Sequence, residues 1–155
     1  DIGLDLLQLL REHLVLIHTG ESRNAQSAVE EVYRNHKTAD GQQALDELAF
    51  CGREFPERLR QSDIEGCAAL SSRNWEAQKK LAPSSTTPLL DDMYAYARDH
   101  GALGGKICGA GGGGAFIFFA RQPDQLKQAM KARFTNCFEI DFEFEPGNIK
   151  QLNAI

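Results

Sequence analysis

The feature that most constrains this chain is a run of glycines between residues 104 and 114. Seven of the chain's 14 glycines fall within these eleven positions. Glycine loses more conformational entropy on folding than any other residue, so such a cluster indicates backbone angles closed to other residues, or close approach of another group to the main chain. A two-residue hairpin turn would need fewer glycines. We therefore predict a loop that is approached by a ligand or a neighbouring segment, with a plain glycine-rich turn as the alternative.

The residues around the run indicate a strand, a loop and a second strand. Gly109, Gly111 and Gly114 form a G-x-G-x-x-G pattern, but the dinucleotide-binding interpretation requires a helix after the loop. Here the apolar run 116–119 follows, which is typical of a strand. No Gly-Lys-Ser/Thr sequence ends the loop, so the Walker pattern is also absent. Consecutive backbone N–H groups can still attract phosphate oxygens.

Composition excludes several classes of function. The net charge of −5 is spread along the chain without a basic stripe, so we expect no nucleic-acid partner. No apolar run approaches the ~20 residues of a membrane span, so we expect no membrane partner. The four cysteines are widely spaced, which favours reduced thiols and a cytoplasmic location over disulfides or a zinc site. The histidines form no ligand cluster, and we predict no metal ligand. Because the chain begins at Asp1 without methionine, we expect it to be a piece of a longer protein.

Periodicity predicts an α+β domain. The expected order is a helix over 5–13, a strand over 14–18, and helices over 22–36, from Asp40 to near Pro56, over 63–81 and over 88–100, followed by the strand–loop–strand unit, a helix over 123–134 and a strand over 138–145. The order at the end of the chain matches a ferredoxin-like split βαβ core with an antiparallel sheet and extra inserted helices, which we expect on one side of the sheet. The alternating last strand should turn its phenylalanines inward and its acids toward water.

A second candidate site follows the strand over 14–18. Thr19 and Gly20 form a turn, and Ser22 and Arg23 then stand at the start of a helix, where anions are attracted. Arg23 offers a bidentate phosphate contact. The alternative is that Ser22 only caps the helix and Arg23 is a solvated charge. Lys106 similarly allows two interpretations, a ligand of phosphate groups or a surface charge.

These stretches resemble a known family. The run from Lys106 to Gly114, with the apolar strand after it, resembles the third sequence motif of the GHMP kinases, which phosphorylate small molecules with ATP. Residues 14–23, 74–81 and 101–106 are similar to the heptose-phosphate kinase branch of that superfamily.

The resemblance implies that residues 1–155 are a GHMP kinase C-terminal domain without the N-terminal ATP-binding half. It implies contacts with ATP or the phosphate loop from Gly109, Ala110, Gly111, Gly112, Gly113, Gly114 and Lys106, and substrate binding by Thr19, Gly20, Ser22 and Arg23. It further implies ATP and magnesium in the intact enzyme, no catalytic or metal-binding residue in this stretch, and two partners, the protein's own N-terminal kinase domain and a sugar or sugar phosphate. We therefore expect the isolated chain to be inactive. The alternatives are a non-catalytic binding or interaction domain, or a kinase for a hexose or phosphomevalonate.

Overall fold

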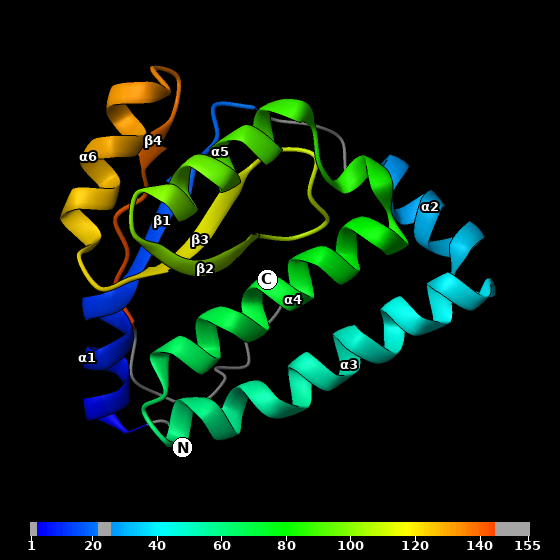
Figure 1. Ribbon diagram of the computed structural model, residues 1–155, viewed down its shortest axis with the longest axis horizontal. Coiled ribbons are helices and arrows are strands. Elements are labelled where there is room, and N and C mark those ends of the chain that lie inside the picture. Colours follow the sequence, from blue (N-terminus) through cyan, green and yellow to red (C-terminus); the bar gives the residue numbers. More distant parts are fainter. Residues whose placement is uncertain (1–2, 22–25, 145–155) are drawn as a thin grey trace, which may run out of the picture.

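The computed structural model describes residues 3–21 and 26–144. Its centre is one sheet of four strands, β1 (Leu14–His18), β2 (Ala102–Ile107), β3 (Ala115–Ala120) and β4 (Phe138–Glu139). The strand order is β2-β3-β1-β4, and every neighbouring pair is antiparallel (Figure 1). This order confirms the predicted α+β architecture with an antiparallel, split βαβ sheet.

Seven helical segments surround the sheet in the part of the chain that the structure describes. They are α1 (Leu4–His13), α2 (Gln26–Asn35), α3 (Ala39–Arg60), α4 (Ile64–Leu81), the 3₁₀ turn η1 (Pro83–Ser85), α5 (Pro88–Asp99) and α6 (Pro123–Arg133). The start of α5 follows its sequence, because Pro88 occupies the first helical position and the Thr87 hydroxyl accepts a hydrogen bond from the Leu90 N–H at 3.2 Å. None of the described helices is both long and apolar enough to cross a membrane.

The helices cover both faces of the sheet, which corrects the expectation that they lie on one side. Phe116 and Phe118 pack into a buried cluster with residues of α5 and α6, whereas Phe119 and half-buried Ile117 belong to a second cluster with α1, α3 and α4. Successive side chains of a strand point to opposite faces, so β3 needs partners on both. Its continuous apolar run is the sequence signal of a doubly covered strand.

Helix α4 lies beside β2, the edge strand of the sheet (Figure 1). The Gly105 N–H, which has no neighbouring strand on that side, donates to the Ser72 hydroxyl of α4 at 3.3 Å. A Cβ atom on Gly104 would collide with the carbonyl oxygen of Ala68. Gly104 thus allows a helix to pack closely on a strand, whereas a Cβ atom on Gly105 would collide with Ile117 of β3.

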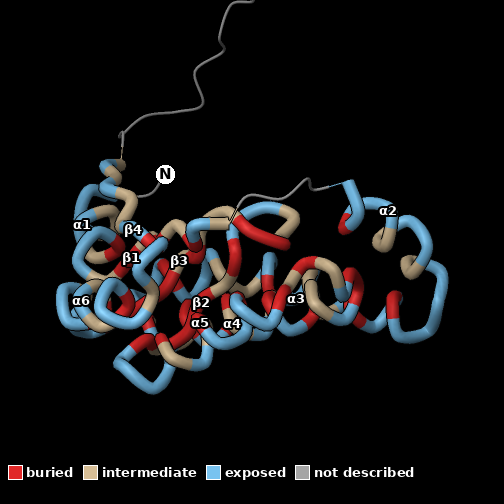
Figure 2. Tube along the Cα trace, turned by 90° about the horizontal axis from the view of Figure 1, so that it is seen from above, coloured by how far each residue is buried: buried red, intermediate tan, exposed pale blue. Residues whose placement is uncertain are grey.

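The sequence offers Asp40 as the N-cap of α3, and Pro56 as the residue where this helix ends or kinks or where the next turn opens; the structure corrects the cap and the end. The N-cap of α3 is Thr38, whose hydroxyl accepts from the Gly41 N–H, and Asp40 lies inside the first turn. Pro56 does not end the helix, which continues to Arg60. Proline removes the one backbone hydrogen bond to the residue four positions earlier. The long contact of α3 with α4, visible in Figures 1 and 2, keeps the helix continuous past that point.

The apolar spacing predicts Val29 and Tyr33 on the inner face of the helix over 22–36, and Leu89 on that of the helix over 88–100, and both faces need correction. Val29 and Tyr33 of α2 are 46% and 73% exposed, and only Ala28 is buried among the described residues of that helix. Figure 2 shows α2 at the end of the molecule, away from the sheet. In α5, Leu90 is buried while Leu89 is partly exposed, one position away from the predicted face.

The last strand is shorter than predicted, and its predicted alternation holds only in part. Described strand geometry covers only Phe138–Glu139, and Glu145 lies outside the described residues. Glu139 forms ion pairs with Lys127 at 2.7 Å and Lys131 at 3.4 Å, both on α6. Phe142 and Phe144 join the second apolar cluster. Asp141 and Glu143 are exposed, so residues 141–144 follow the predicted alternation. At the strand itself the pattern is reversed, because Phe138 is exposed and Glu139 is half-buried against α6.

Candidate functional site

The glycine loop joins β2 to β3 over residues 108–114. The hydrogen bond from the Cys108 N–H to the Ala115 carbonyl, 2.8 Å long, closes its base. Gly109, Gly111, Gly112 and Gly114 have φ values of 71°, 86°, 77° and 87°. L-residues with side chains rarely adopt these angles, so the glycines are required by the backbone path itself.

Two neighbouring elements hold the tip of the loop. From α4, the Gln78 side-chain amide donates to the Gly109 carbonyl at 3.0 Å. From η1, the Ser85 carbonyl accepts from the Gly112 N–H, and a Cβ atom on Gly111 would collide with that same carbonyl. The close approach predicted from the glycine cluster therefore exists inside the chain, at Ser85.

The turn after β1 holds the other end of the loop. The Thr19 N–H donates to the Gly114 carbonyl, and the Gly114 N–H donates to the Glu21 carbonyl, both at 2.8 Å. These bonds extend the β1–β3 ladder beyond its last strand pair, His18 with Ala115. The fold therefore places Thr19 and Gly20 directly beside the glycine loop, so the two described parts of the predicted site adjoin.

Local hydrogen bonds define the conformation of this turn. The buried Thr19 hydroxyl accepts from the Glu21 N–H at 3.2 Å. The Gly20 N–H donates to Nδ1 of His18 at 3.0 Å, which requires Nδ1 to be unprotonated and leaves the ring proton of the neutral imidazole on Nε2. The His18 ring stacks on Phe138 with centroids 4.6 Å apart. His18 thus has a structural role in the turn.

Several backbone donors of the loop have no partner within the described part of the chain. These are the N–H groups of Gly109, Ala110, Gly111 and Gly113, in contrast to those of Cys108, Gly112 and Gly114. Gly109 is exposed, and Ala110 and Gly111 are half-buried. Backbone N–H groups in such a path form anion-binding concavities. The loop therefore has the chemistry required to receive phosphate oxygens.

Two of the buried polar atoms without partners belong to residues that bond to the loop. Among the described residues, the buried polar atoms without partners are Glu21 Oε2, Ser84 Oγ, Ser85 Oγ and Trp75 Nε1. Glu21 and Ser85 belong to the segments that bond to the loop, and Ser84 is the residue before Ser85. Such atoms are uncommon because an unmet hydrogen bond is costly. Sequence reasoning missed Glu21, Ser84 and Ser85; the one available signal was their position in polar turns next to the predicted elements.

The remaining predicted site residues are not joined to the loop by a described contact. Ser22 and Arg23 lie outside the described residues. The Lys106 ammonium donates to the Asn74 side-chain oxygen of α4 at 2.6 Å, and burial lowers the pKa of Lys106. Within the described ranges, no group of three or more His, Cys, Asp or Glu side chains is arranged to hold a metal ion. The residues described here do not by themselves fit a magnesium site, and we derive no step through one.

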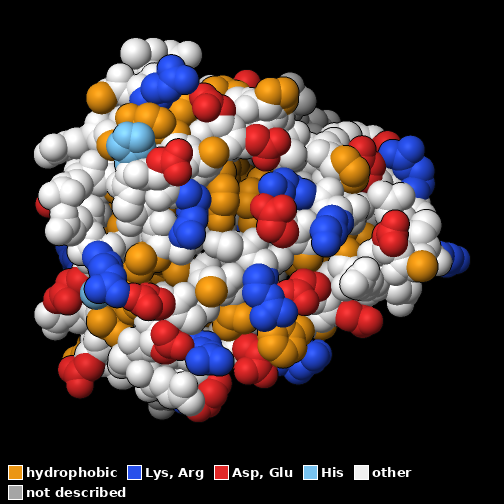
Figure 3. All heavy atoms as spheres, viewed as in Figure 1, with side chains coloured by type: hydrophobic (Ala, Val, Ile, Leu, Met, Phe, Trp, Pro, Cys, Tyr) orange, Lys and Arg blue, Asp and Glu red, His pale blue; other side chains and the backbone are white. Residues whose placement is uncertain are grey.

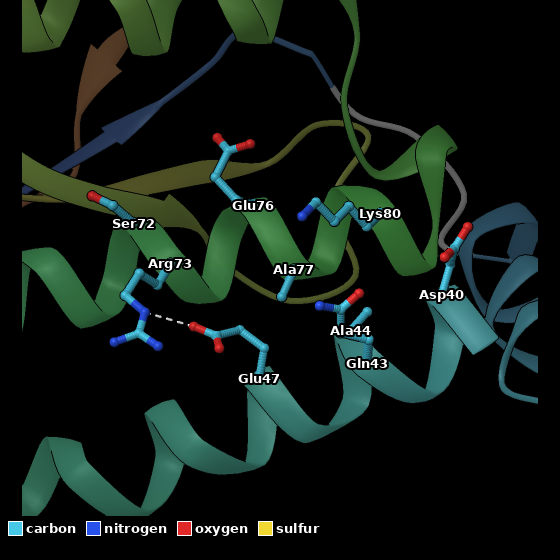
Figure 4. Close-up of a pocket in the computed structure, with 9 residues that line it drawn as sticks. All are labelled: Asp40, Gln43, Ala44, Glu47, Ser72, Arg73, Glu76, Ala77 and Lys80. Atoms are coloured by element: carbon cyan, nitrogen blue, oxygen red, sulfur yellow. Dashed lines mark hydrogen bonds and ion pairs between the residues drawn. The ribbon is translucent and has the colours of Figure 1, made fainter. Parts of the chain in front are cut away.

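A large cavity lies elsewhere, between α3 and α4 (Figure 4). It measures about 710 Å³ and is lined by Asp40, Gln43, Ala44, Glu47, Ser72, Arg73, Glu76, Ala77 and Lys80. Arg73 and Glu47 pair across it at 2.6 Å. Acidic and basic side chains are also intermixed over the face shown in Figure 3. Because the lining is of mixed charge and includes no loop residue, this cavity is separate from the candidate phosphate site.

Comparison with known families identifies the chain. Residues 57–136, more than half of its length, match the family described as GHMP kinases C terminal. The matched range includes α4, η1, α5 and the whole β2–loop–β3 unit. The chain belongs to this family.

Individual relatives agree with this assignment. The D-glycero-alpha-D-manno-heptose 7-phosphate kinase of Campylobacter jejuni is 28% identical over 144 residues, which cover 91% of this chain and 42% of that kinase. The bifunctional fucokinase/GDP-fucose pyrophosphorylase of Arabidopsis thaliana is 25% identical over 141 residues, which cover 88% of this chain and 13% of that protein. The chain thus spans less than half the length of these relatives.

A solved structure shows the same fold. The L. major mevalonate kinase, in complex with R-mevalonate, superimposes with a TM-score of 0.72 at 21% identity, covering 82% of this chain and 41% of that one. At this identity the likeness supports the fold and leaves the substrate open.

Proposed function

We propose that this chain is the C-terminal part of an ATP-dependent sugar kinase whose substrate is a heptose phosphate. In this proposal the glycine loop forms the wall of the cleft that faces the transferred phosphate, and the Thr19–Gly20 turn lies on the substrate side. The observation that carries the proposal is the pair of backbone hydrogen bonds joining the turn to a loop with four unpartnered N–H groups.

The chemistry of phosphoryl transfer suits such a wall. Catalysis of this reaction is mainly positioning and stabilisation of charge on the phosphoryl oxygens. Because Ser85 and Glu21 already hold the loop at Gly112 and Gly114, its other N–H groups need little reorganisation when a charged group arrives. The absence of side chains on the glycines leaves space for a phosphate or for a second loop. We propose that ATP, magnesium and the catalytic base meet this wall from another part of the full-length protein.

The unpartnered side-chain atoms favour a substrate rich in hydroxyl groups. The Glu21 carboxylate offers an acceptor, and the Ser84 hydroxyl offers both a donor and an acceptor. A carboxylate would repel phosphate but accept a hydrogen bond from a sugar hydroxyl. We therefore assign Glu21 and Ser84 to hydroxyl groups of the sugar and the loop N–H groups to phosphate.

One second candidate substrate is fucose, which the likeness to the plant fucokinase favours. Both candidates are polyols, so the assignment of Glu21 and Ser84 serves either. The test is to assay the full-length protein with ATP and magnesium against heptose phosphates, fucose, hexoses, mevalonate and phosphomevalonate, with residues 1–155 alone in parallel. We expect turnover by the full-length protein only, fastest with a heptose phosphate. Full-rate turnover by residues 1–155, or turnover of no sugar, would contradict the proposal.

A loop variant tests the phosphate assignment directly. Ala110 is the one residue with a side chain in the loop segment 109–114, and it is half-buried. Ala110→Asp should lower kcat/KM at least about tenfold and raise the KM for ATP, because the new carboxylate repels the phosphates. Ala110→Asn is the matched control, with nearly the same shape and no charge, and should stay close to the unmodified protein. Equal activity of the two variants would place the phosphate away from this loop.

A further inference from the structure

A second, smaller cavity lies between the sheet and the helix pair α3–α4. It measures about 240 Å³ and is lined by Cys51, Gly52, Phe55, Leu70, Ser71, Asn74, Lys106, Ile117 and Phe119. Most of this lining is apolar, with a lysine and an amide among it. The cavity shares no residue with the glycine loop and is not used by the proposed phosphate site.

Lys106 is exceptional among the half-buried lysines of the described chain. Lys79 and Lys127, with side chains 23% and 24% exposed, each have a carboxylate partner, Glu76 at 2.8 Å and Glu139 at 2.7 Å. Lys106 is also half-buried, but its only described partner is the neutral side-chain oxygen of Asn74. A charge removed from water normally requires an opposite charge. The protein therefore holds a cation at the cavity whose counter-charge does not come from the described residues.

The surroundings of Lys106 define what kind of anion fits. Asn74 uses its side-chain oxygen for Lys106, and its Nδ2 group has no partner among the described residues, so the ammonium and the amide offer two adjacent donors. Phe55, Leu70 and Phe119 supply apolar walls. Burial raises the pKa of the Cys51 thiol, which therefore stays neutral and adds no negative charge. Two donors at one end and hydrocarbon walls suit a carboxylate on an apolar body better than a highly charged phosphate.

We propose that this cavity binds a small carboxylic acid with an apolar body, with its carboxylate on Lys106 and Asn74. The volume is below the range of about 300–1,000 Å³ that is usual for ligand sites, so the acid is compact. In this proposal Lys106 serves the acid instead of the ATP phosphates that the family resemblance implies for it, and the existence of the site does not depend on the proposed kinase activity.

The position of the site connects it to the loop. Asn74 and Gln78 are one turn apart on α4, and Gln78 holds the Gly109 carbonyl. Lys106 is two residues before Cys108, where the loop begins. A carboxylate bound to Lys106 and Asn74 would therefore join β2 to α4, close in sequence to Gln78 on α4 and to Cys108 at the start of the loop. Occupancy of the cavity should order the loop, and the acid would act as a modulator of the phosphate wall.

The experiment uses the full-length protein, benzoate as the probe and benzyl alcohol as its neutral counterpart, with affinities measured by calorimetry in the absence of ATP and sugar. We expect benzoate to bind about tenfold or more tightly than benzyl alcohol. Lys106→Met keeps the apolar stem and removes the charge, so it should abolish this preference. Lys80→Met, which removes an exposed lysine from the same region, is the control and should retain it.

A second variant keeps the test decisive if Lys106→Met folds poorly. Asn74→Asp has nearly the same shape and supplies a carboxylate beside Lys106 from within the chain, so it should abolish the benzoate preference while preserving or raising the melting temperature. Equal binding of benzoate and benzyl alcohol by the unmodified protein, or an undiminished preference in Asn74→Asp, would overturn the proposal. The binding experiment measures no turnover, so its outcome is independent of the kinase assay. If only the kinase proposal fails, benzoate still binds although the full-length protein phosphorylates no sugar.

Discussion

Strand β3 and the glycine loop before it meet at Ala115, yet they are held in place by different interactions. The side chains of β3 alternate between two apolar clusters, and Phe116 and Phe118 are fully buried. The loop is held by hydrogen bonds of its main chain. The Gln78 side chain donates to one loop carbonyl, and two loop N–H groups donate to the carbonyl groups of Ser85 and Glu21. The six residues of β3 are thus held by their side chains, whereas five of the seven loop residues before them are glycines.

This difference indicates that β3 contributes mainly to stability and the glycine loop mainly to function. Burial of aromatic side chains stabilises a fold without leaving any group available to a ligand. A glycine loop contributes little burial but leaves backbone donors unpaired, which is favourable only when a ligand or a neighbouring segment meets them. Substitutions in the two regions should therefore affect different measurements.

The largest loss of stability is expected from Phe118→Ala. Removing a fully buried ring from the cluster with α5 and α6 should lower the free energy of unfolding by about 3–5 kcal/mol. Phe119→Ala is the matched variant on the opposite face, where the ring already borders the 240 Å³ cavity, and its cost should be smaller by about 1 kcal/mol or more. Chemical denaturation of residues 1–155 measures both, and an equal or larger cost for Phe119→Ala would contradict the difference between the faces.

A smaller loss of stability, with a larger loss of activity, is expected from Gly111→Ala. Its positive φ costs about 1–2 kcal/mol in any L-residue, and its Cβ would also collide with the Ser85 carbonyl. Gly109→Ala shares the positive φ but has open space around the new Cβ, so it should show the φ cost alone. Melting temperature and kcat/KM of the full-length protein separate the two variants. If they behave alike, the contact with η1 does not position the loop.

The smallest effect on stability is expected from Ser85→Ala. The Ser85 hydroxyl is buried and has no partner among the described residues, so its removal should leave the free energy of unfolding unchanged or raise it by up to about 1 kcal/mol. Thr87→Ala, two residues later, removes a buried hydroxyl that caps α5 and should cost about 1 kcal/mol. Denaturation midpoints of the two variants in the same background test the contrast. A destabilised Ser85→Ala would show that its hydroxyl already has a structural partner.

Most of the fold could be predicted because its signals are local. The apolar run of β1, the cap at Thr87 with Pro88, and the strand–loop–strand unit each depend on residues close together in the sequence. The errors occurred where packing overrides local preference, as at Pro56 inside α3, or where a helix has no layer to cover, as at Val29 and Tyr33. The candidate site was predicted only in part, since the residues that flank the loop, Ser85 and Glu21, are marked only by their position in polar turns.

The sequence by itself determined the conformation of the loop, because glycines at positive φ are a local requirement that no distant contact can replace. The tertiary structure decided what the loop and its neighbours touch. The turn after β1 contacts Gly114, which is distant in the sequence, because β1 pairs with β3. Lys106 contacts Asn74, 32 residues earlier, because α4 packs along the edge of β2. Such contacts depend on which faces of the sheet are covered and by which helix, and that is settled only when all the apolar faces are buried together.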